Sequence, residues 1–134
     1  MNILPINNTN SNTNFKAKFP KKYIKQFIRE VEYKDVDDVP KLYTMLNFIK
    51  QQQGKTAKIK NFGLWSQIQI DGKSLTNERK YFTAIHALED ATVNHKNTLI
   101  KDTPLKRLSE DEFEREWIKN SKKTKSDIEN LYED

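Results

Sequence analysis

The pattern of apolar and polar residues changes its period several times along the chain, and each change marks a new element. Over residues 64–70 the side chains alternate, with one row made of Leu64, Ser66, Ile68 and Ile70 and the other of Trp65, Gln67 and Gln69. A period of two is typical of a strand with one buried face. The pair Asp71-Gly72 follows, and tight hairpin turns prefer such a pair. The segment therefore predicts a strand with Leu64 in its buried row, followed by a hairpin turn.

Shorter alternating segments surround this strand. Residues 56–60 alternate small or apolar side chains with lysines, and residues 73–75 could add a short third strand. Phe15, Ala17 and Phe19 alternate with two lysines, which favours a short edge strand. These segments together predict a small antiparallel sheet of two to four strands.

Two helices are expected before the sheet. The first runs from Pro20 to about Tyr33, because proline suits a first helical turn and apolar residues recur there at helical spacing. The aspartates of residues 35–38 end it and begin the second helix, which closes near Gly54. Their short connection predicts an antiparallel pair.

A third helix is expected after the sheet, capped by Thr76 or Asn77 and running to about Val93. Its expected inward residues are Tyr81, Ala84, Ile85, Leu88 and Ala91, with Phe82 at the margin. Further along, Ser109 and Glu112 form a capping box, and Leu108 with Phe113 supplies the matching hydrophobic staple. This pattern predicts a helix from Glu110 to about Asn120. A weaker capping box at residues 126–129 predicts a final short helix.

These elements define one α+β domain with an antiparallel helix pair, a small antiparallel sheet covered by a helix, and a C-terminal helical extension. Residues 1–14 contain six asparagines and predict a disordered tail. Residues 15–97 form the expected α+β core domain. Residues 98–134 form the expected connector and helical C-terminal extension.

Composition excludes several chemistries. The chain has no cysteine and three widely spaced glycines, so thiolate chemistry and glycine-rich phosphate loops are excluded. His86 and Asp90 lie one helical turn apart, a spacing that could present two ligands to a metal, but no third ligand is evident and an exposed pair explains the same residues. We therefore expect no catalytic residues, no metal and no cofactor, and no enzyme. No secretory signal or long apolar run is visible, so a cytoplasmic location is the default expectation.

The net charge of +5 is unevenly distributed. Residues 1–60 hold 12 Lys or Arg against 5 Asp or Glu, whereas residues 97–134 hold 8 against 10. A basic surface can attract nucleic acid. However, 20 of the 24 basic residues are lysines, and A/T-rich coding also favours lysine. The candidate nucleic-acid contacts are Lys22, Lys25, Arg29, Lys73, Arg79 and Lys80.

Residues 64–91 superficially resemble the second half of a double-stranded-RNA-binding domain. The order strand, Asp71-Gly72-Lys73, then a helix opening with Arg79-Lys80 carries this resemblance. The glycine-bracketed Ser-Lys-Lys run with which such domains grip phosphates is absent. The resemblance therefore indicates general α+β geometry and does not assign the chain to that family. Lys73, Arg79 and Lys80 remain candidate phosphate contacts.

Trp65 decides between the two main functional hypotheses. Alternation places it on the outer face of the sheet, where the C-terminal helix could cover it through Phe113 and Trp117, or residues 15–19 could do so. Otherwise it is an exposed anchor for a partner, because tryptophan is enriched at interface hot spots. The first hypothesis is a non-enzymatic protein-interaction module in which Trp65, Trp117 and Phe113 bind a protein partner or a second copy. The second is a nucleic-acid-binding protein.

Overall fold

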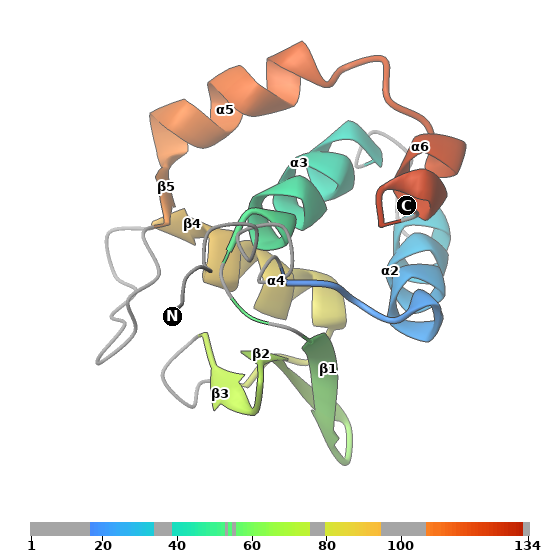
Figure 1. Cartoon of the computed structure of the whole chain (residues 1–134), viewed down its shortest axis with the longest axis vertical. Helices are drawn as coiled ribbons and strands as arrows, with labels where there is room; N and C mark the ends of the chain where they lie inside the picture. Colours follow the sequence, from blue (N-terminus) through green and yellow to red (C-terminus); the bar gives the residue numbers. More distant parts are fainter. Residues whose placement is uncertain are drawn as a thin grey trace, which may run out of the picture.

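The chain folds into a group of helices with a small sheet packed at one end, which confirms the expected α+β class (Figure 1). The computed structural model describes residues 17–33, 39–52, 54, 56–75, 80–94 and 107–132. Its helices are α2 (Lys21–Tyr33), α3 (Val39–Lys50), α4 (Ala84–Thr92), α5 (Glu110–Lys119) and α6 (Lys125–Asn130). The expected Asn-rich tail and most of the connector lie outside the described residues.

The main sheet is antiparallel, in the order β1-β2-β3. Its strands are β1 (Ala57–Phe62), β2 (Trp65–Ile70) and β3 (Lys73–Ser74). Asp71 and Gly72 both have positive φ, 51° and 84°, so they form the predicted two-residue turn between β2 and β3. The prediction that Leu64 lies in the buried row of the strand was wrong. Leu64 lies with Gly63 in the β1–β2 turn, where it is 76% exposed.

One continuous core joins all the elements. The sheet packs against α4, and α4 packs against α2 and α3. Helix α5 lies across α3, while α6 contacts both α2 and α3. Ile128, Leu131 and Tyr132 are buried, and the Tyr132 ring meets Phe19 edge-on at 6.1 Å. The C-terminal helices are therefore part of the core.

Helix α4 begins later than the sequence predicts. Residues 76–79 lie outside the described part of the chain, and Tyr81 is extended and bridged to Ser66 of β2. Thr83, with φ −120° and ψ 152°, caps the helix by accepting a hydrogen bond from the His86 backbone N–H. The prediction that Tyr81 and Phe82 are helical was wrong, because strand pairing prevails over the helical period there.

A second, two-stranded sheet was not expected. It pairs β4 (Val93–Asn94) with β5 (Leu108–Ser109) in parallel, directly before α5. The pairing brings the start of α5 beside the end of α4. It therefore fixes how the C-terminal helices enter the core.

Candidate docking surface

The β1–β2 register divides the side chains of the hairpin between two faces. Directly opposite residues share a face, so Ile59 and Ile68 lie on one side, and Phe62 and Trp65 on the other. The first side is buried, and the sheet packs on α4. The second, outer side carries Lys58, Lys60, Phe62, Trp65, Gln67 and Gln69. Lys60 and Trp65 are exposed, Lys58, Phe62 and Gln69 are half-buried, and Gln67 is buried.

An aromatic cluster lies at the tip of this outer face. Trp65 is 51% exposed and Phe82 is 65% exposed, and their rings meet edge-on with centroids 6.2 Å apart. The ammonium group of Lys80 stands 4.0 Å from the centroid of the Phe62 ring, in a cation–π contact. Leu64 adjoins Trp65 in the turn. We call Phe62, Leu64, Trp65, Lys80 and Phe82 the hairpin patch.

The segment that supplies Lys80 and Phe82 is fixed by backbone pairing. Ser66 and Tyr81 exchange two backbone hydrogen bonds, of 2.6 and 2.8 Å. The Tyr81 hydroxyl donates to the Asp90 carboxylate of α4, so Tyr81 points inward. Because side chains alternate along an extended segment, Lys80 and Phe82 point outward.

The end of this segment is fixed by the N-terminus of α4. The Glu30 carboxylate, from α2, accepts hydrogen bonds from the backbone N–H groups of Ile85 and Ala84, at 2.9 and 3.3 Å. A carboxylate at this position satisfies unpaired donors and favours the helix dipole. The segment that presents Lys80 and Phe82 is thus held at both ends by contacts within the fold.

The three predicted partner-binding residues do not come together. Phe113 is buried, and its ring centroid lies 6.3 Å from that of Trp117 on α5. Lys41 of α3 stands over both rings and pairs with Glu89 at 3.0 Å. Helix α5 therefore covers α3 and does not cover Trp65, whose aromatic neighbour is Phe82. Of the alternatives that the sequence leaves open for Trp65, cover by the C-terminal helix is therefore not the one found, and the side chain is half exposed.

The predicted basic residues fall into separate groups. Lys22, Lys25 and Arg29 are exposed on α2, which lies away from β3 in Figure 1. Lys73 is opposite Ile70, so the register assigns it to the inner side of the sheet, whereas Lys80 is on the outer side. Arg79 lies outside the described residues. The structure therefore brings only Lys80 of this set into the hairpin patch.

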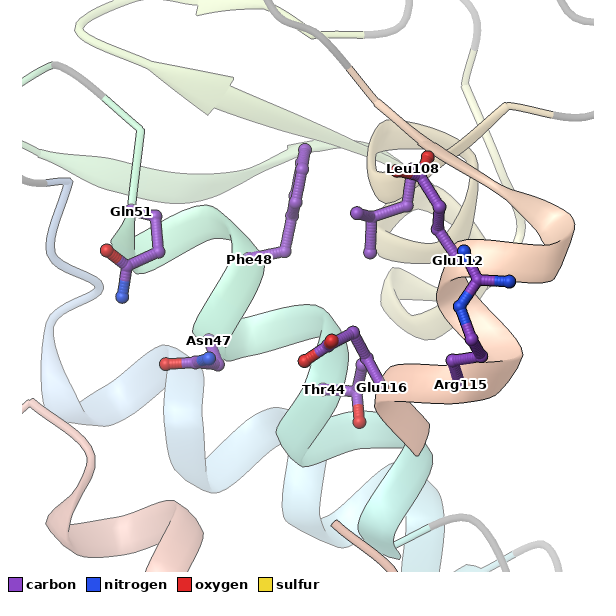
Figure 2. Close-up of a pocket in the computed structure, with 8 residues that line it drawn as sticks. All are labelled: Thr44, Asn47, Phe48, Gln51, Leu108, Glu112, Arg115 and Glu116. Carbon is purple, nitrogen blue, oxygen red and sulfur yellow. The ribbon is translucent and has the colours of Figure 1, made fainter. Parts of the chain in front are cut away.

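A groove between α3 and α5 is a second surface of interest (Figure 2). Its volume is about 270 Å³, and Thr44, Phe48, Leu108 and Glu116 are among its lining residues. Glu116 pairs with Lys119 at 3.2 Å, and Thr44 accepts a hydrogen bond from Asn120 at 3.0 Å. These polar groups serve contacts within the fold, and we assign no ligand to the groove.

The expected exposed His86–Asp90 pair is absent. His86 is exposed, but Asp90 is only 5% exposed and binds Tyr81 and Arg107. The described residues contain no cluster of three or more potential metal-ligating side chains. They also contain no helix with the length and apolarity needed to cross a membrane. Comparison with protein families, with curated proteins and with solved structures found no match to this chain.

Proposed function

We propose that this chain is a non-enzymatic protein-interaction module whose partner docks on the hairpin patch. The distribution of exposed apolar side chains carries the proposal. Four large apolar side chains are exposed in the described part of the chain. Two of them, Trp65 and Phe82, are in ring contact, and a third, Leu64, directly precedes Trp65 in the chain. Scattered exposed apolar residues are ordinary, whereas a cluster of them indicates an interaction site.

Preorganisation supports the same function. Phe82 and Lys80 flank the backbone pairing of Tyr81 with Ser66, and Trp65 is paired with Phe62 across the hairpin. Aromatic side chains held in this way lose little conformational freedom on binding. Tryptophan in such a cluster is a suitable hot-spot residue.

A displayed library of random peptides, selected against the full chain, tests this function. Peptides that dock on the hairpin patch should lose about tenfold or more in affinity for Trp65→Ala. Ile118→Ala is the matched control, because Ile118 is 65% exposed but lies on α5. If every selected peptide binds the Trp65→Ala variant as well as the wild type, the proposal fails.

Single-stranded nucleic acid is the second candidate ligand. The lysine–aromatic contact between Lys80 and Phe62 favours it, because such proteins combine basic side chains with aromatic stacking platforms. The test is binding of a fluorescent single-stranded oligonucleotide. Affinity that falls steeply with salt and disappears in Trp65→Ala would support this candidate over the first.

A further inference from the structure

The outer edge of β1 is already extended by another part of the chain. β1 is the first strand of the sheet, and Lys18 bridges to Thr56 just before it, in parallel. The Ala57 backbone N–H donates to the Lys18 carbonyl at 3.0 Å. The start of this edge is therefore paired with the chain at Lys18 through one isolated bridge, and the chain turns away into α2 after Phe19.

Further along β1 the same edge is open. In an antiparallel ladder, alternate residues bond the neighbouring strand, and the residues between them direct their N–H and C=O groups to the other side. Since the Ala57 N–H points to Lys18, the backbone groups of Ile59 and Asn61 point to the same outer edge. No hydrogen bond to a further strand is found for them among the described residues. Such unpaired groups are a template for strand addition.

The charge along this edge selects the kind of strand that can be added. Lys58 and Lys60 stand on the outer face of β1, and β1 and β2 contain no Asp or Glu. Within the described residues, Lys58, Lys60 and Lys80 form no ion pair. Lysines on an edge strand discourage pairing between copies of one protein, because like charges would meet. The same charges attract an acidic segment.

We infer that an extended acidic segment of a partner protein adds to β1 as a further strand. This inference rests on the proposed docking function of the hairpin patch and names its partner. Backbone groups of the segment pair with Ile59 and Asn61. On its outer face, carboxylates meet Lys58 and Lys60, and the next outward residue is apolar and contacts Phe62 and Trp65. This is the strand-addition mode, in which main-chain bonds give affinity and alternate side chains give specificity.

Three synthetic peptides of equal length test the inference against the full chain. The first alternates Glu and one terminal Phe with small residues, the second has the same composition without alternation, and the third replaces Glu by Lys. The first should bind about tenfold more tightly than either other peptide. In the complex, the Ile59 and Asn61 amide hydrogens should exchange with solvent more slowly than in the unbound chain.

A charge-reversed variant provides the matched control. In Lys58→Glu/Lys60→Glu the preference should shift from the Glu peptide to the Lys peptide, while the circular dichroism spectrum stays that of the wild type. Equal binding of the first two peptides, or unchanged exchange at Ile59 and Asn61, overturns strand addition. In that case, binding that still requires Trp65 leaves the docking function intact.

Two other outcomes separate the remaining alternatives. If the acidic peptide binds the Trp65→Ala variant as tightly as the wild type, the docking function itself fails. If a single-stranded oligonucleotide binds the hairpin patch and the acidic peptide does not, the partner is a nucleic acid and the inference is overturned.

Discussion

Arg107 and Asp90 form a buried ion pair that fastens the segment before α5 to α4. The guanidinium Nη1 lies 3.5 Å from Asp90 Oδ1, and each side chain is 6% exposed. Nη1 also donates to the Asp90 backbone carbonyl. Burial lowers the pKa of Arg107, and the neighbouring Asp90 carboxylate opposes that shift. Because Asp90 also accepts from Tyr81, the same carboxylate supports the segment that presents Lys80 and Phe82.

Removal of Asp90 should destabilise the fold strongly. Asp90→Ala leaves the Arg107 guanidinium buried without its counter-charge, which costs about 3–5 kcal/mol. The Asp90→Ala/Arg107→Ala double variant should lose less than the two single losses added together. Urea unfolding of Asp90→Ala, Arg107→Ala and the double variant measures these losses in the free energy of unfolding. Lys125→Ala is the control, because its pair with Glu32 is exposed, and it should cost less than about 1 kcal/mol.

Trp65 and Phe113 should respond in opposite ways to truncation. Trp65 is half exposed, so Trp65→Ala should keep the fold and cost roughly 1 kcal/mol or less. Phe113 is 7% exposed between α5 and α3, so Phe113→Ala should cost about 3–5 kcal/mol. In a Trp117→Phe background, Trp65 fluorescence should be red-shifted and readily quenched by acrylamide. A blue-shifted, protected Trp65 would contradict the exposed hairpin patch.

The helix caps offer a test at the level of single hydroxyl groups. Ser109 and Glu112 form the predicted capping box of α5, with both reciprocal bonds in place. For α6 the cap is Thr124 with Asp127, so the prediction of a second box at residues 126–129 was wrong. Ser109→Ala and Thr124→Ala should each cost about 1 kcal/mol in thermal or urea unfolding. Ser126→Ala, inside α6, should change stability by less than either of these substitutions. An equal loss would refute the assignment of Thr124 as the N-cap of α6.

Tyr132 should make the fold sensitive to alkali. Its hydroxyl donates to the Leu46 carbonyl at 2.8 Å, and burial raises the pKa of Tyr132 well above its ordinary value of 10.0. The folded state therefore keeps the proton that the unfolded state loses, so stability is complete below pH 10.0 and falls as pH rises beyond it. Unfolding free energies of the wild type and Tyr132→Phe, compared across pH, measure this contribution.

The Tyr132→Phe variant should behave differently on the two sides of that pH. Near neutral pH it should lose about 1 kcal/mol with the hydrogen bond to Leu46. Above pH 10.0 its stability should fall less steeply than that of the wild type. Parallel profiles of stability against pH for the two proteins would show that the pKa of Tyr132 is the same in the folded and the unfolded state, contrary to this prediction.

Features set by neighbouring residues were predictable from the sequence. The apolar stripes of α2 and α3, the Asp71-Gly72 turn and the Ser109 capping box all depend on residues within a few positions of one another. The two capping patterns near the C-terminus overlap, however, and both match the same local rule. The sequence alone does not choose between Thr124 and Ser126.

Features set by distant residues were not predictable in this way. Glu30 caps α4 from another helix, and Tyr81 joins β2 in spite of the helical period around it. Asp90 was predicted to be exposed because its partner, Arg107, lies beyond a long connection. The hairpin patch also depends on this long-range pairing. Alternation did predict that Trp65 points outward, but only the bridge between Ser66 and Tyr81 brings Phe82 to it.

The contact between Phe19 and Tyr132 has a consequence for synthesis of the chain. Phe19 also packs on Phe27, so the apolar side of α2 depends on a ring supplied by residues just after α6. During translation α2 leaves the ribosome long before Tyr132 is made. Its apolar side then stays uncovered at that place until α6 and Tyr132 emerge, and a nascent chain with exposed apolar surface is prone to aggregate. Completion of this part of the core therefore has to wait for α6 and the residues directly after it.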